Sequence, residues 1–170
     1  MPKQNKEEDK YGPIFLETIV KEDWIDINGH MNMAYYIILF DQALTNFLEE
    51  IDLGSNYIRE SGKSVFALEN HVTYQHELKQ GDPVCVHFQL LDIDHKFIHY
   101  FMRLLHRDNA TVSATIEQIS LNVNMDSRTP ARFEQDKMDI LRQTVERHKK
   151  HGIPREIGRS IAIRRPKKDL

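Results

Sequence analysis

The residues best suited to chemistry lie in one short stretch, Asp26-Ile27-Asn28-Gly29-His30-Met31-Asn32. Within five residues it holds a carboxylate, a carboxamide, a flexible glycine and an imidazole, and the most apolar run of the chain follows at once. A carboxylate or an imidazole can move a proton as a general acid or base, and a carboxylate can also act as a nucleophile. We therefore expect this stretch to have a chemical task.

A long helix is expected to position the stretch. Asn32 is a good N-cap residue, and neither Gly nor Pro interrupts residues 33–50, so the sequence predicts a helix of that length. Its first turns are apolar almost all round, which is typical of a buried helix. The free N–H groups and positive dipole end of such a helix suit an oxyanion. The backbone N–H groups of Met33 and Ala34 are the candidate donors, and one such donor contributes roughly 3 to 4 kcal/mol of transition-state stabilisation.

The remaining segments predict an antiparallel sheet. Two helices are expected besides the long one, over 53–60 and 133–150, and strands are expected over 14–20, 64–74, 84–91, 96–107 and 110–125. Hairpin-length connections between the last four strands indicate a meander of antiparallel neighbours. The predicted fold class is α+β, with five to six antiparallel strands wrapped round the long central helix and a C-terminal helix. Because that helix is too apolar for one small sheet to cover, we expect a partner subunit.

The strand predicted over 64–74 alternates between two faces. One face carries Phe66, Leu68, Val72 and Tyr74, and the other carries Ala67, Glu69, His71 and Thr73. A carboxylate inside an otherwise apolar strand is costly unless it is paired. Glu69 is therefore either a residue on the substrate side or one half of a structural pair with a strand histidine.

Length and composition favour one domain, because 170 residues can bury a core without disulfides or metal. We expect a disordered leader over 1–12, a single domain over 13–150 and a basic tail over 151–170. The single cysteine, Cys85, gives no disulfide framework and is expected to be a buried small apolar residue. The polar residues 1–10 lack the apolar core of a signal peptide, so we expect a cytoplasmic protein.

Charge is unevenly placed, although the net charge is only −3. Residues 142–170 contain ten Lys or Arg against three Asp or Glu, a net charge of +7, so the preceding residues carry −10. Such a tail could meet an anionic ligand, but a basic C-terminal end is more often simply solvated.

Other catalytic classes lack their signatures. The sequence contains no Gly-x-Ser-x-Gly elbow, no Walker loop and no Gly-x-Gly-x-x-Gly fingerprint. The histidine spacings, such as His71 to His76 and His95 to His99, match no His-Glu-x-x-His helix. We therefore expect neither a metal site nor a cofactor.

Two motifs together give the chain a family resemblance over about residues 14–125. The first is the Asp26 to Asn32 cluster with the Tyr36 that follows, and the second is Val72-Thr73-Tyr74-Gln75-His76-Glu77-Leu78 with Gly81-Asp82. The chain resembles the hotdog-fold thioesterases of the 4-hydroxybenzoyl-CoA thioesterase branch. Within that branch it is most similar to thioesterases of carnitine breakdown that are thought to act on betainyl-CoA.

The resemblance implies a hydrolase of acyl-CoA thioesters whose site uses Asp26, Asn28, His30 and Glu77. Some family members have a cysteine after the glutamate, whereas Leu78 stands here, so a cysteine nucleophile receives no support. The family forms dimers or dimers of dimers with active sites at the subunit interface. The implied partners are an acyl-CoA substrate and a second copy of the chain, as a homodimer or homotetramer, with no nucleic acid and no membrane.

Each of these residues also has a structural interpretation. Asp26 is either the general base or a nucleophile, but it could instead cap the turn before the helix. Asn28 could orient water or hold Asp26, or it could be the turn residue of an Asn-Gly pair with positive φ. His30 could position the carboxylates or polarise the thioester carbonyl, whereas a lone histidine is more often a core residue. Glu77 could be the second acid or an exposed residue before a turn.

Aromatic, acidic and basic side chains are the candidate substrate contacts. A trimethylammonium acyl group would need aromatic rings and a nearby acid, which Trp24, Tyr35, Tyr74 and Glu69 could supply beside Asn32, although packing of these rings in the core or a dimer is favoured. The phosphates of CoA would need cations at the rim of the groove, for which Lys63, Lys96, Arg103 and the tail over 155–165 are candidates.

Two other functions stay open. A hotdog dehydratase or hydratase would carry a differently spaced Asp/His pair, and Gly29 directly before His30 counts against it. A non-catalytic acyl-CoA-binding module would not need the Asp26 carboxylate.

Overall fold

The computed structural model describes residues 10–163 of the chain. Most of the predicted leader and the last seven residues of the predicted basic tail lie outside the described residues. From Gly152 to Ile163 the tail has no regular secondary structure beyond turns.

The long helix α2 (Met33–Glu50) has the predicted bounds. Asn32 has extended φ and ψ angles, and its side chain accepts a hydrogen bond from the Ala34 N–H, as an N-cap does. A stripe of α2 packs into the core, where Phe47 stacks on Phe88 of the sheet with ring centroids 3.9 Å apart. The sheet covers only one side of the helix, as expected for so apolar a helix, and Met33, Ile37 and Ile38 remain exposed in the single chain.

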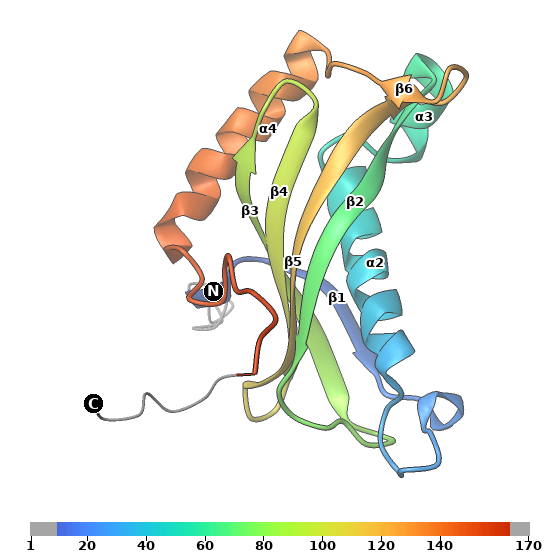
Figure 1. The fold of residues 1–170 in the computed structure, drawn as a ribbon, viewed down its shortest axis with the longest axis vertical. Helices are drawn as coiled ribbons and strands as arrows, with labels where there is room; N and C mark the ends of the chain where they lie inside the picture. The colour runs from blue at the N-terminus through green and yellow to red at the C-terminus, as the bar shows by residue number, and fades with distance from the viewer. Residues whose placement is uncertain (1–9, 164–170) are drawn as a thin grey trace, which may run out of the picture.

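The sheet contains six antiparallel strands that curl round α2 (Figure 1). They are β1 (Ile14–Ile19), β2 (Lys63–Tyr74), β3 (Pro83–Ile93), β4 (Phe97–His106), β5 (Thr111–Asn124) and β6 (Thr129–Pro130). The first five lie in the order β1-β3-β4-β5-β2, and β6 pairs with β5. The predicted wrapping of a five- to six-stranded antiparallel sheet round a central helix is confirmed.

The expected meander of four strands is wrong in one respect, because β2 pairs with β5 and not with β3. The segment over 75–82 therefore crosses one end of the sheet from β2 to β3. Its eight residues can span roughly 26 Å, whereas three strand spacings amount to only about 14 Å. This leaves β2 at the open edge of the sheet and brings Leu78 next to Met31, just before α2, where the Met31 N–H donates to the Leu78 carbonyl.

The predicted faces of β2 are also partly wrong. A bulge between Ala67 and Glu69 adds one residue, so the alternation shifts at Leu68. By cross-strand register, Phe66 lies on the same face as Glu69, away from α2, while Val72 and Tyr74 lie on the inner face.

Helix α4 (Gln135–His148) covers the part of β3 that β1 leaves free, and the 3-10 turn η2 (Lys149–His151) follows it. The Leu90 N–H of β3 donates to Nδ1 of the buried His148 at 2.9 Å.

The short helix α3 (Ser55–Ser61) leads from α2 into β2. Among the described residues, no helix is long and apolar enough to cross a membrane.

Candidate active site

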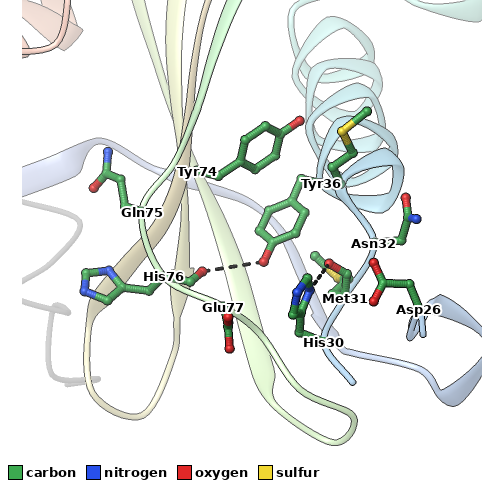
Figure 2. Close-up of a pocket in the computed structure, with 10 residues that line it drawn as sticks. Asp26, His30, Met31, Asn32, Tyr36, Tyr74, Gln75, His76 and Glu77 are labelled. Atoms are coloured by element: carbon green, nitrogen blue, oxygen red, sulfur yellow. Dashed lines mark hydrogen bonds between the residues drawn. The ribbon is translucent and has the colours of Figure 1, made fainter. Parts of the chain in front are cut away.

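A cavity of about 510 Å³ lies where three segments meet: the loop before α2, the first turn of α2, and residues 74–77 at the end of β2 (Figure 2). Ten residues line it: Asp26, His30, Met31, Asn32, Met33, Tyr36, Tyr74, Gln75, His76 and Glu77. Three of the four catalytic residues implied by the resemblance, Asp26, His30 and Glu77, are therefore brought together. Asn28 is exposed and does not line the cavity.

Asp26 sits in a tight turn that the local sequence explains. The Asn28 N–H donates to Asp26 Oδ1 at 2.8 Å, and the Gly29 N–H donates to the Asp26 carbonyl at 3.0 Å. Gly29 has φ +78, whereas Asn28 does not have a positive φ angle, so the alternative in which Asn28 adopts positive φ is wrong. Asp26 is half-buried, and within the described chain no donor faces its Oδ2. The turn therefore holds one carboxylate oxygen and leaves the other open to the cavity.

His30 lies beside Asp26 and is half-buried. Its Nδ1 atom is 3.3 Å from the Met31 carbonyl oxygen. Because a carbonyl oxygen only accepts, Nδ1 carries the proton in this contact, which leaves Nε2 of a neutral imidazole as an acceptor. In that state His30 can accept a proton but cannot donate one to a carbonyl.

Glu77 comes from the strand side of the cavity, opposite the helix (Figure 2). Its side chain is exposed, but the next residue, Leu78, is buried, and the Leu78 carbonyl accepts a hydrogen bond from the Met31 N–H at 2.7 Å. The two halves of the site are thus joined by a backbone hydrogen bond.

Tyr36 and Tyr74 form the aromatic wall of the cavity. Their rings meet edge to face with centroids 5.2 Å apart. Burial raises the pKa of both hydroxyls, so both stay protonated at neutral pH. Tyr36 marked the family resemblance but was not predicted to line the site, and neither were Gln75 and His76. The spacing of Tyr36, one helical turn after Asn32, could have indicated it.

Three predicted substrate contacts lie elsewhere. Trp24, in the 3-10 turn η1 (Glu22–Trp24), stacks on Tyr35 with ring centroids 5.4 Å apart, and neither residue lines the cavity. Glu69 is exposed on the outer face of the sheet, beside a separate cavity of about 230 Å³. The carboxylate–histidine pair on that face is Glu117 with His99, at 3.0 Å, and does not involve Glu69. Of the predicted set, only Asn32 and Tyr74 line the candidate site.

The two predicted oxyanion donors differ. The Ala34 N–H donates to the Asn32 side chain at 3.0 Å, so it is occupied, contrary to expectation. The Met33 N–H, at the first helical position, has no acceptor in the part of the chain that the structure describes. One open donor therefore points from the start of α2.

The residues that line the cavity include two carboxylates and neither Lys nor Arg. The candidate cations for CoA phosphates are placed away from it: Lys63 pairs with Glu134, Lys96 lies over Phe97, and Arg103 is buried against Glu156. Among the described residues, no three His, Cys, Asp or Glu side chains are grouped to hold a metal ion.

Comparison with protein families gives one match. A model described as the thioesterase-like superfamily matches residues 20–144, which include every residue of the candidate site.

Known relatives agree with this match. The chain is 34% identical to the betainyl-CoA thioesterase of Pseudomonas aeruginosa over 147 residues, which cover 86% of this chain and 92% of that protein. It is 32% identical over 162 residues to a protein of Rhizobium meliloti named L-carnitine dehydrogenase/betainyl-CoA thioesterase, covering 95% of this chain but only 32% of that one. A hypothetical protein from Staphylococcus aureus, solved in complex with CoA, matches with a TM-score of 0.83 and 27% identity, over 89% of this chain and 96% of that chain.

Proposed function

The chain belongs to the thioesterase-like superfamily, and from this premise we propose that it hydrolyses an acyl-CoA thioester to a free acid and CoA. The observation that carries the proposal is the shared cavity, which is lined by Asp26, His30 and Glu77 together with Met33, the first residue of α2.

Asp26 starts the reaction in one of two ways. As a general base it takes a proton from water while the water oxygen attacks the carbonyl carbon. As a nucleophile it attacks the carbon itself and forms an anhydride as the carbon–sulfur bond breaks and the CoA thiolate leaves, and water then hydrolyses the anhydride. The turn made by Asn28 and Gly29 supports either role, since it holds Oδ1 and leaves Oδ2 facing the cavity.

The Met33 N–H stabilises the oxyanion that forms on the thioester oxygen. The carbon–sulfur bond then breaks, and the CoA thiolate leaves and takes up a proton. His30 and Glu77 lie where they can orient the attacking water or carry that proton. Asn28 acts in this scheme through its backbone N–H, which holds Asp26.

The lining of the cavity favours a short acyl group with positive charge. Two aromatic rings, Tyr36 and Tyr74, attract a cation through their faces, and Asp26 and Glu77 add negative charge without any Lys or Arg in the lining. A negatively charged acyl group would be repelled. The relative from Pseudomonas aeruginosa, named a betainyl-CoA thioesterase, supports the same class of substrate, a trimethylammonium acyl-CoA.

Thiol release from a panel of acyl-CoAs tests both parts of the proposal. The panel contains betainyl-CoA and 3,3-dimethylbutanoyl-CoA. Their acyl groups have the same shape, but the first has a quaternary nitrogen where the second has a carbon, so only the first is charged. We expect kcat/KM to be at least about tenfold higher for the charged member, which corresponds to a modest cation–π and charge contribution. Equal rates would contradict a cationic acyl group but not the hydrolase.

Asp26→Asn separates the enzyme from the alternatives. Removing a general base typically costs 10² to 10⁴ in rate, so we expect turnover to fall at least about 100-fold while CoA binding persists. A wild-type protein that binds acyl-CoA but releases no thiol from any panel member would favour the non-catalytic binding module. Water addition to an enoyl-CoA in place of thiol release would favour the hydratase.

The open apolar surface supports a homodimer or homotetramer. Met33, Ile37 and Ile38 of α2 are exposed, as are Leu68 and Tyr74 of the neighbouring edge strand β2. A second copy of the chain would bury these side chains and cover the mouth of the cavity. For the compartment we propose the cytoplasm, because a sequence with a single cysteine, Cys85, contains no disulfide framework of its own.

A further inference from the structure

We propose that Tyr36 is a positioning residue of this site: its hydroxyl holds the peptide groups on both sides of Glu77 and so fixes where the Glu77 carboxylate lies. The inference depends on the proposed role of Glu77 in thioester hydrolysis. Tyr36 itself need not touch the reacting atoms.

The contacts of the Tyr36 hydroxyl carry the inference. The hydroxyl donates to the His76 carbonyl oxygen at 3.5 Å, the contact drawn in Figure 2. Against the larger effect of burial, the Leu78 backbone N–H also acts on the Tyr36 hydroxyl oxygen and lowers the pKa of Tyr36. His76 and Leu78 are the two neighbours of Glu77, so one buried hydroxyl bridges the residue that carries the carboxylate.

The surrounding segment is held at its other positions by the sheet and the helix. The N–H groups of Gln75 and His76 both donate to the Ser113 carbonyl, and the Leu78 carbonyl accepts from Met31. The backbone of Glu77 has no hydrogen bond of its own among the described residues. The Tyr36 hydroxyl therefore supplies the restraint that Glu77 lacks.

The environment keeps the Tyr36 hydroxyl protonated, so that it can donate to the His76 carbonyl. Burial raises the pKa of Tyr36, and the nearby Glu77 carboxylate raises it further. The oxygen therefore keeps its proton and can donate to His76 throughout the range of an activity assay. The edge-to-face contact with Tyr74 holds the ring, and Tyr36 is only 4% exposed.

A double-mutant cycle tests the inference. Tyr36→Phe keeps the ring and removes the hydroxyl, so we expect kcat to fall about tenfold with KM changed less than about threefold. In the Glu77→Gln background, the same substitution should change kcat by less than about twofold, because the carboxylate through which Tyr36 acts is already lost. A further tenfold loss there, or full activity of Tyr36→Phe alone, would overturn the proposal.

Hydrogen exchange gives a readout that does not depend on turnover. In Tyr36→Phe we expect the Leu78 amide to exchange about tenfold faster, while amides in the middle of α2 keep their rates. Unchanged exchange at Leu78 would overturn the proposed bridge even if activity falls. If the wild-type protein hydrolyses no acyl-CoA, the proposed function fails, whereas the exchange result still decides whether Tyr36 fixes this segment.

Tyr57→Phe is the matched control. Tyr57 is also 4% exposed, and its hydroxyl bonds Asn122 and Glu134, away from the cavity. Its loss should lower thermal stability but leave kcat and Leu78 exchange unchanged. A tenfold fall in kcat for this control would show that loss of any buried hydroxyl has the same effect, and the proposal would fall.

Discussion

At the scale of single residues, the site depends on backbone geometry as much as on side chains. The Asp26 carboxylate is held by the backbone N–H of Asn28, and the turn that makes this possible passes through Gly29 at φ +78. Side chains other than glycine rarely adopt such a conformation, although there is open space for a methyl group at this position. The turn can therefore be tested without a steric clash.

Gly29→Ala should reduce both stability and activity. The strain of a non-glycine residue at this φ angle costs about 1 kcal/mol of unfolding free energy, and relief of the strain would shift Asp26 from its place. We expect kcat/KM, measured by thiol release, to fall at least about tenfold, because a small displacement of a reacting group strongly lowers the rate. Gly62→Ala is the control: Gly62 ends α3 at φ +64 with equally open space, and it lies outside the cavity. Equal losses of activity in both variants would contradict a specific role for the turn.

At the scale of elements, local patterns predicted each long segment but not how the segments pair. The bounds of α2 followed from the Asn32 cap and an uninterrupted run, both of which are local. The pairing of β2 with β5 was missed because the turn before β3 shows where a strand ends and not which strand becomes its neighbour. The bulge at Leu68 was missed because nothing in the local alternation marks an extra residue, and so Phe66 and Ala67 were each predicted on the wrong face, whereas Glu69 lies with His71 and Thr73 as predicted.

The pairing of α4 with β3 predicts a pH-dependent stability. Burial lowers the pKa of His148 to about 4, with smaller contributions from His151, Arg147 and Lys150, and its neutral Nδ1 accepts the Leu90 N–H. In the unfolded chain the His148 imidazole takes up a proton near pH 6.5, whereas in the folded chain it stays neutral down to about pH 4. The stabilisation that comes from the neutral imidazole is therefore fully present above pH 6.5 and is lost as the pH falls toward 4. Between pH 7.5 and 5, this group should remove about 2 kcal/mol of unfolding free energy.

Denaturant unfolding of wild type and His148→Gln at both pH values measures this contribution. Glutamine can still accept a hydrogen bond but does not titrate, so the fall in stability between pH 7.5 and 5 should be about 2 kcal/mol smaller in the variant. The same fall in both proteins would show that His148 is not the titrating group.

At the scale of the whole molecule, the candidate site lies beside the open edge strand β2 of the sheet. Asp26, His30 and Glu77 lie between the start of α2 and the end of β2. The helix side of the cavity, including Tyr36 by its spacing from Asn32, could be derived from the sequence, whereas Gln75 and His76 could not. Gln75 and His76 belong to the segment over 75–82 that crosses the end of the sheet, and this crossing is a consequence of long-range strand order. The exposed apolar residues beside them belong to two elements that meet at the open edge.

Ile38→Glu tests whether a second copy covers this surface. Ile38 is 43% exposed on α2, and a buried unpaired carboxylate there would cost several kcal/mol of association free energy. We expect sedimentation velocity to show wild type as a dimer or larger and the variant as the 20.1 kDa monomer, with reduced thiol release because the cavity then stays open to water. Ile153→Glu, at an isoleucine that is 85% exposed on the tail, should change neither property. A wild-type protein that sediments as an active monomer would show that one chain suffices, and the apolar surface beside β2 would then need another occupant.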